Sequence, residues 1–347
     1  MIEPTMPVPV IDEISRDDWN MSSRNSDIRS ALDNWANNGT GDDFALATLC
    51  HLEGAAPRPL GTQMLFARDD SGAMRMSRYF SGGCIEHDVA KHAGEVLENG
   101  QPRMLVYGTG SPWIDIRLTC GGSMHILVER VNAHALALGR LRHADATREP
   151  ALWTSNGWAR QVLYATPNNC STWRWSFDPE TWCYSRIYLP RPRLLIVTNA
   201  DASALALAEL GSIAGIETWL WRPSGPATPC PIPGVRYVRS GIGGAGAWPV
   251  RLDAWTWVAL MTHDSELDLV IAPWALRSEA GYVGVLGAGK RRPQFLHDLR
   301  HQGLSETQIN KLCMPIGIGG CGKAPWEVAT AILAQLFQLA WSSQPTT

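Results

Sequence analysis

Two cysteines of the chain stand beside paired glycines, a combination of residue types that could do chemistry. Gly82-Gly83-Cys84 precedes a helical pattern, and Cys120-Gly121-Gly122 precedes a strand pattern. Paired glycines let the backbone turn sharply or come close to a ligand. At a helix N-terminus, unpaired N–H groups favour a thiolate, which binds soft metals and attacks sulfur. The alternative for each cysteine is a packed side chain beside a tight turn.

Two turns in the second half of the chain follow apolar strand patterns directly. Thr262-His263-Asp264 is the first, and Gly287-Ala288-Gly289-Lys290, continued by two arginines, is the second. Ligands of open α/β sheets bind beyond the carboxyl ends of the strands, so both turns could contact a ligand. Amides and cations in the second turn suit an anion such as a phosphate. The alternatives are an N-cap in the first turn and a solvated basic helix start in the second.

The determinants of dinucleotide binding are missing from the same half. The turn Thr198–Ser203 has no glycine, and the second strand ends at Trp221 where an acidic residue would bind a ribose. Gly317–Lys323 approaches the spacing of a phosphate-binding loop, but Ala324 replaces the hydroxyl residue that would hold Mg²⁺. These departures exclude an ATPase and argue against NAD(P) or FAD binding.

The periodicity of apolar residues predicts an α/β protein in two main parts. Strand patterns around a helix at 85–99 predict an α+β domain over residues 41–150. Strands alternate with helices over 193–341, which predicts a Rossmann-like domain with a doubly wound parallel sheet. Residues 1–40 are predicted to be an N-terminal extension, and 151–192 a Trp-rich connector.

Composition narrows the function classes. The 347 residues include 30 Lys and Arg against 33 Asp and Glu, a net charge of −3, which argues against a nucleic-acid partner. No apolar run reaches the about 18 residues of a membrane span. The N-terminus lacks the basic and apolar regions of a signal peptide, so we expect a cytoplasmic protein with its eight cysteines as thiols.

Taken together, the motifs resemble the XdhC/CoxI family of molybdoenzyme maturation factors. The resemblance spans roughly residues 44–341, and its matching stretches are Gly54–Gly61, Ser81–Glu86, Cys120–Gly122, Met261–Asp268, Tyr282–Gly287 and Pro315–Pro325. The chain departs from the family at Thr198-Asn199-Ala200, where relatives keep glycines, near Trp221, and at Cys321, where a glycine is more usual.

The resemblance implies a binding protein without turnover. Its cargo would be the molybdenum cofactor (molybdopterin), with or without a cytosine nucleotide. The implied role is to protect the cofactor, support its sulfuration by a cysteine desulfurase, and insert it into an apo molybdenum hydroxylase of the xanthine dehydrogenase or aldehyde oxidase type. A cofactor-nucleotide transferase is a further implied partner, and a homodimer the implied assembly.

Site residues are carried over from the family motifs. Cys84 is the first candidate for cofactor contact and Cys120 the second. The others are Gly82, Gly83, Glu86, Arg58, Thr262, His263, Asp264 and Lys290. Two other functions stay open: a nucleotide-dependent oxidoreductase that uses the Rossmann-like domain, and a scaffold that contacts only the apoenzyme and the sulfurtransferase.

Overall fold

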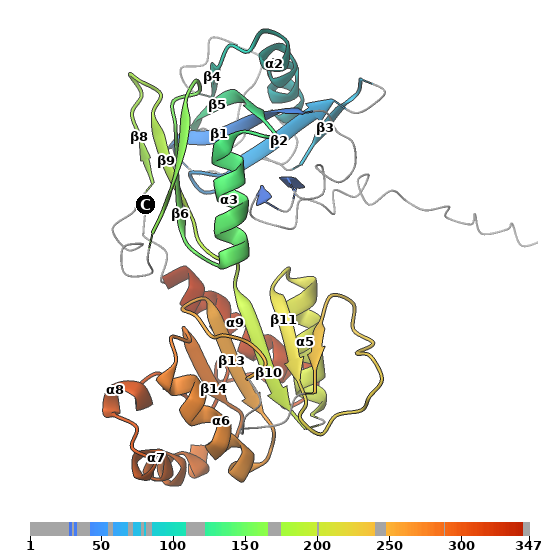
Figure 1. The fold of residues 1–347 in the computed structure, drawn as a ribbon, viewed down its shortest axis with the longest axis vertical. Helices are drawn as coiled ribbons and strands as arrows, with labels where there is room; N and C mark the ends of the chain where they lie inside the picture. Colours follow the sequence, from blue (N-terminus) through green and yellow to red (C-terminus); the bar gives the residue numbers. More distant parts are fainter. Residues whose placement is uncertain are drawn as a thin grey trace, which may run out of the picture.

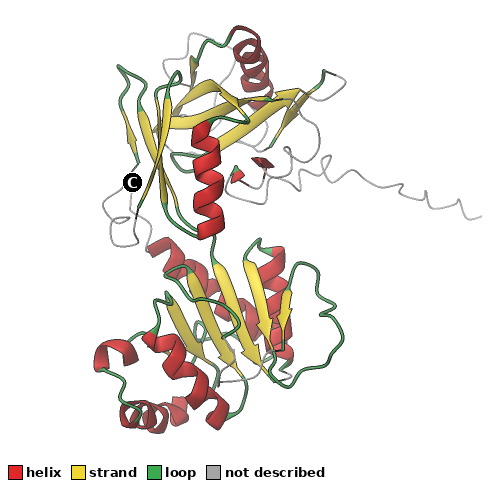
Figure 2. Cartoon of the chain, in the orientation of Figure 1, coloured by secondary structure: helices red, strands yellow, loops and turns green. Residues whose placement is uncertain are grey.

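The computed structural model places two halves one after the other along the long axis of the molecule (Figure 1). The structure describes residues 28–29, 31–32, 42–54, 58–68, 72–77, 80, 85–108, 122–165, 175–199, 201–239, 248–287 and 289–342. The first half is built on antiparallel sheets and the second on a parallel sheet (Figure 2). The predicted fold class is confirmed.

An antiparallel sheet of five strands forms the centre of the first half. Its order is β3-β2-β1-β5-β4, and the strands are β1 (Asp43–Glu53), β2 (Gln63–Arg68), β3 (Met74–Met76), β4 (Arg103–Gly108) and β5 (Ser123–Asn132). Helix α2 (Glu86–Asn99) packs its apolar stripe on one face and ends at Gly100, which has a φ of 71°. Glycine tolerates that left-handed conformation, as the Asn-Gly ending predicts.

A second antiparallel sheet lies within residues 151–192, the segment predicted to be a Trp-rich connector. Its order is β7-β6-β9-β8, with β6 (Ala151–Ser155), β7 (Arg160–Tyr164), β8 (Ser176–Phe177) and β9 (Tyr184–Tyr188). Together with α3 (Leu136–Thr147) it covers the other face of the first sheet. Trp153, Tyr184 and Tyr188 are fully buried in the shared core, because the inward positions of these strands carry large aromatics.

A short piece of the N-terminal extension belongs to this core. Ile28 is 0% exposed and Leu32 is 1% exposed. Between them, Arg29 donates to Asp145 at 2.7 Å and to the carbonyl of Leu189 at 2.9 Å. These described residues of the extension are therefore fixed by both packing and ion pairing.

The second half is a six-stranded parallel sheet with helices on both faces. Its order is β12-β11-β10-β13-β14-β15, with β10 (Arg193–Thr198), β11 (Glu217–Trp221), β12 (Arg236–Val238), β13 (Thr256–Met261), β14 (Tyr282–Val285) and β15 (Leu312–Cys313). The strand order reverses direction between β10 and β13, which is the arrangement of a Rossmann sheet. Successive residues of β10 belong alternately to the cores on its two faces, as its unbroken apolar run predicts.

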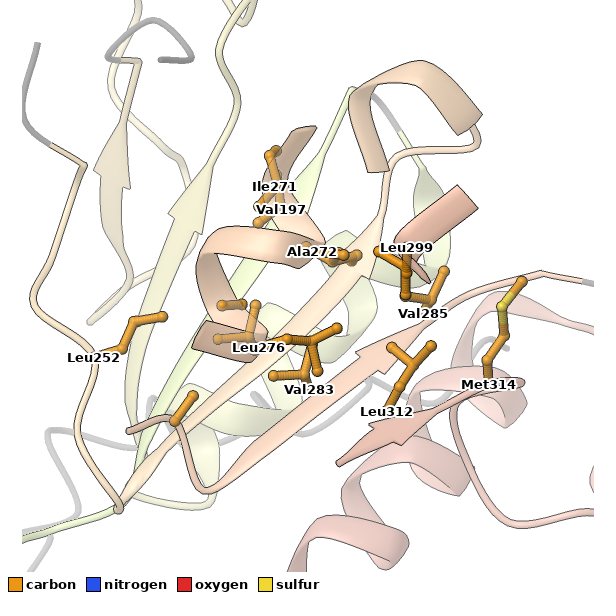
Figure 3. Close-up of a cluster of buried hydrophobic side chains, with 14 of the residues drawn as sticks. Val197, Leu252, Ile271, Ala272, Leu276, Val283, Val285, Leu299, Leu312 and Met314 are labelled. Carbon is orange, nitrogen blue, oxygen red and sulfur yellow. The ribbon is translucent and has the colours of Figure 1, made fainter. Parts of the chain in front are cut away.

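Helices α5 (Ala202–Ile213) and α9 (Pro325–Ser342) cover one face of this sheet. Helix α6 (Ser265–Arg277), the short turn η2 (Gly289–Arg291), α7 (Arg292–His301) and α8 (Glu306–Ile309) follow on the other side. Figure 3 shows that core, in which Ile271, Ala272 and Leu276 of α6 cluster with valines of the sheet.

The two halves meet at the amino ends of the parallel strands. Arg148, which follows α3, donates through Nε and Nη2 to Asp253 at 2.5 and 3.1 Å, and through Nη1 to Glu217 at 3.3 Å. Arg193, the first residue of β10, also pairs with Glu217. The carboxyl ends of the strands therefore point away from the first half, as Figure 1 shows.

Candidate functional site

Two of the glycine motifs meet at one edge of the first sheet. Gly54 follows β1 with a φ of +79°, and a Cβ at this position would lie 3.2 Å from the Cα of Gly122. The register pairs Glu53 and Gly108 with Ser123, so the ends of β1 and β4 and the start of β5 share this edge. Glycine at both contact positions lets the two backbones approach each other closely.

The residues of highest interest lie outside the described part of the chain: Gly82, Gly83, Cys84 and Cys120. The residues that border the first motif are well placed. Glu86 is fully buried, and its two carboxylate oxygens accept from the backbone N–H groups of Phe80 at 2.8 Å and Ile85 at 3.2 Å. Glu86 therefore ties together the two ends of the segment that carries Cys84.

A polar network continues from the start of α2 to β4. Tyr107 donates its hydroxyl to Asp88 at 2.7 Å. Burial raises the pKa of Tyr107, and the hydrogen bond and charge of Asp88 add to this effect, so the phenol is neutral at physiological pH. Arg103 bonds to the Nδ1 of His92 at 2.7 Å and pairs with Glu95. This network fixes α2 against the strand that ends at the glycine edge.

Arg58 is exposed, and the structure holds its loop from below. Gly61 has a φ of +77°, and a Cβ there would come within 3.0 Å of the Trp175 ring. Arg186 of β9 donates to the carbonyl of Gly61. The second sheet therefore supports the loop that carries Arg58.

The turn after β13 contains three predicted site residues with different roles. Thr262 is buried and donates to Asp268 at 2.6 Å. His263 has a φ of 56°, and 62% of its side chain is exposed. Asp264 is the N-cap of α6, since its Oδ1 accepts from the N–H groups of the second and third helical residues at 3.0 and 3.1 Å. The capping alternative thus describes Asp264 correctly, while His263 is available to a ligand.

Lys290 lies in η2, after β14, and is exposed. Its neighbour Arg291 lies 3.5 Å from the buried carboxylate of Asp268. The turn therefore presents one cation to solvent and directs another toward α6.

The predicted residues fall into two groups at opposite ends of the molecule. Arg58, Glu86 and the glycine edge belong to the first half. Thr262, His263, Asp264 and Lys290 lie at the carboxyl edge of the parallel sheet, which points away from the first half (Figure 1). One small ligand cannot contact both groups within a single chain.

Sequence reasoning missed several residues that shape these edges. Asp88 and Tyr107 stand on a predicted helix and a predicted strand, but a pattern of apolar residues does not pair them. Trp175 and Arg186 belong to the second sheet, in a segment whose sequence predicts only a connector. Asn199, whose amide donates to the carbonyl of Thr262 at 3.2 Å, could have been found from its place after the first strand of the switch point.

Two functional features are not found among the described residues. In that part of the chain, no group of three or more His, Cys, Asp or Glu side chains is arranged to hold a metal ion. None of the described helices is long and apolar enough to cross a membrane.

These features define a class: a two-part binding protein with a glycine-lined sheet edge and a Rossmann domain. Comparison with known proteins gives the family. Residues 39–108 match the family described as "XdhC and CoxI family", and 195–336 match "XdhC Rossmann domain". The two matches together contain more than half of the chain. The chain belongs to the XdhC and CoxI family, as its motifs predict.

Individual relatives align over most of the chain. The molybdenum cofactor insertion chaperone PaoD of Escherichia coli (strain K12) is 27% identical, over 86% of this chain and 83% of PaoD. A protein of Bacillus subtilis (strain 168), named as a probable component of xanthine dehydrogenase, is 22% identical, over 86% of this chain and 93% of its own. A crystal structure from Bacillus halodurans, titled as a xanthine dehydrogenase, superposes with a TM-score of 0.68 at 24% identity, covering 90% and 95% of the two chains. That likeness shows the fold.

Proposed function

We propose that this protein is a chaperone that binds the molybdenum cofactor and inserts it into a molybdenum hydroxylase of the xanthine dehydrogenase or aldehyde oxidase type. The match to PaoD over most of both chains carries the proposal. A binding protein without turnover agrees with the name of that relative.

The glycine edge of the first half is the proposed place of cofactor binding. The contact between Gly54 and Gly122 brings the first and third family motifs together, and Glu86 ties the ends of the second. Backbone without side chains offers N–H groups and room to a large planar pterin. Cys84, with Cys120 second, supplies a soft thiolate toward the cofactor, and Arg58 a cation toward its phosphate.

The finer parts of the proposal follow the family. A cysteine desulfurase supplies the sulfur for the cofactor, a nucleotide transferase precedes this protein where the cofactor carries cytosine, and the chaperone acts as a homodimer in the cytoplasm. Asp201, the N-cap of α5, argues against NAD(P) or FAD as ligand, because its carboxylate occupies the helix start where a pyrophosphate would bind. Trp221 is fully buried and packs edge to face on Trp248 and Trp274, so it offers nothing to a ribose.

The test is the amount of cofactor that the purified protein holds. We expect about one molybdopterin per chain, detected by its fluorescence after oxidation. Cys84→Ala should weaken this binding, whereas Cys321→Ala, which changes an exposed cysteine, should not. Unchanged binding in the Cys84 variant would remove that residue from the site. Tight binding of NAD(P) or FAD in calorimetry, with no pterin, would favour the oxidoreductase function instead.

A further inference from the structure

A chain of polar contacts runs along the carboxyl edge of the parallel sheet. Arg222, after β11, donates Nε and Nη2 to the carbonyl of Asn199, after β10, at 3.0 and 2.8 Å. The Nδ2 of Asn199 donates to the carbonyl of Thr262, after β13, at 3.2 Å. Three neighbouring strand ends are thus connected without help from the sheet hydrogen bonds.

Asp268 extends this chain to a fourth strand end. Its Oδ1 accepts from the hydroxyl of Thr262 at 2.6 Å, and its Oδ2 lies 3.5 Å from Nη2 of Arg291, after β14. Asp268 is fully buried in the second turn of α6. It is therefore the point at which the turn after β13 meets the turn after β14.

Charge makes this link matter. Burial raises the pKa of Asp268, and the hydrogen bond from Thr262 and the charge of Arg291 act in the opposite direction, while Asp264 adds a like charge. A buried carboxylate needs such partners, and a buried charge that loses one is costly. The orientation of Arg291 and that of Thr262 are consequently set by the same side chain.

The contacts leave other groups of these turns exposed. His263 follows Thr262 directly, and Lys290 precedes Arg291. The N-termini of α5 and α6 are already capped by Asp201 and Asp264, so an anion at this edge would depend on side-chain cations. How those exposed side chains are presented depends on how the two turns are held.

We propose that Asp268 is a positioning residue of the carboxyl edge. It couples the Thr262-His263-Asp264 turn to the Gly289–Arg291 turn and holds both in one geometry for the phosphate-bearing cofactor. The identity of that ligand rests on the function proposed above, but the coupling itself does not.

The coupling can be measured without any ligand. The imidazole signal of His263 in a ¹H–¹³C spectrum, assigned by its loss in His263→Gln, reports on the first turn. Arg291→Met changes the second turn and should shift this signal. In an Asp268→Asn background, where the charge that faces Arg291 is absent, the same substitution should leave the signal in place. Glu266→Gln, an exposed change on the same helix, is the matched control and should preserve the shift.

A second pair of variants serves if Asp268→Asn does not fold. Thr262→Val removes the hydroxyl and keeps the shape of the side chain, and Thr262→Ser restores the donor. The response of His263 to Arg291→Met should vanish in the valine variant and return with serine. The proposal is wrong if Arg291→Met moves nothing, or moves the signal equally in all backgrounds.

Binding of molybdopterin supplies the functional arm. We expect Asp268→Asn and Thr262→Val to weaken it about tenfold, as for loss of a hydrogen bond to a charged group, with Thr262→Ser and Glu266→Gln unchanged. Coupling in the spectra with unaltered cofactor affinity would overturn the positioning role. If the wild-type protein holds no cofactor, the proposed function fails, and the spectra alone decide whether Asp268 couples the turns.

Discussion

Replacing Gly54 by alanine tests the glycine edge most directly. Gly54 has a φ of +79°, where an L-residue with a Cβ costs about 1–2 kcal/mol. Gly72 has a φ of +84°, and nothing lies within 4 Å of the position of its missing Cβ, so Gly72→Ala carries the same backbone cost without a contact. The difference between the two variants isolates the close approach of Gly54 to Gly122.

The structure sets the size of that difference. A Cβ at Gly54 lies 3.2 Å from the Cα of Gly122, so one backbone must move by a few tenths of an ångström. Binding sites need their groups held within about 0.5 Å, so we expect cofactor retention to fall roughly three- to tenfold in Gly54→Ala and to stay unchanged in Gly72→Ala. Both variants should lose about 1–2 kcal/mol in urea unfolding, with the larger loss for Gly54→Ala.

The assay compares pterin content per chain with unfolding free energy in the same preparations. Equal cofactor retention in both alanine variants would refute the placement of the cofactor at this edge. Equal retention together with equal stability would also show that the contact with Gly122 carries no strain.

Three further predictions concern stability. Leu32→Ala should cost about 2–5 kcal/mol in urea unfolding, because this residue of the extension is fully buried; a loss below about 0.5 kcal/mol would mean that the extension is not part of the core. Glu129→Gln should cost about 3–5 kcal/mol, because the fully buried carboxylate accepts from Tyr184, Ser155 and Arg160, whereas exposed Glu180→Gln should be neutral. At the junction, burial opposes ionisation of Glu217 and Asp253, but hydrogen bonds from Trp219 and Arg193, and from Arg148 and Thr256, outweigh it and lower both pKa values. Their stabilisation is therefore complete above the unfolded pKa of about 4 and is lost as pH falls through the lowered values, and Arg148→Met should diminish this acid-dependent loss in thermal melts.

The second half was largely predictable from the sequence. Its strands are buried on both faces and form continuous apolar runs, which alternate with helices whose ends carry ordinary signals. Ser305 and Gln308 form the predicted capping box, and Gly215 follows α5 with a φ of 77°. The two shortest strands, β12 and β15, were not predicted, because two or three residues carry no periodicity.

The sheet within 151–192 could not be predicted in the same way. Its strands are short, and their outward positions mix Leu152 and Leu163 with polar residues, so the alternation is weak. Helix α3 begins with Leu136, which is largely exposed, and this breaks the apolar stripe that would have marked it. Both elements form because a partner face already exists for them to cover.

The candidate site was predictable as motifs but not as an arrangement. Spacing along the chain does not tell which edge of which sheet a turn reaches. It took the register of β1, β4 and β5 to bring Gly54 and Gly122 together, and the direction of the parallel strands to place His263 far from them.

The division of the cores along the sequence has a consequence for synthesis on the ribosome. Among the described residues, the apolar cores of the first half lie between Ile28 and Tyr188, and both Rossmann cores follow Arg193. The first half therefore closes only after β9 and Leu189, which Arg29 holds, have emerged, but its cores need nothing made later. Vectorial folding would complete the glycine edge while the Rossmann half is still being translated. A nascent chain paused soon after Arg193 would already carry the surface that we assign to the cofactor.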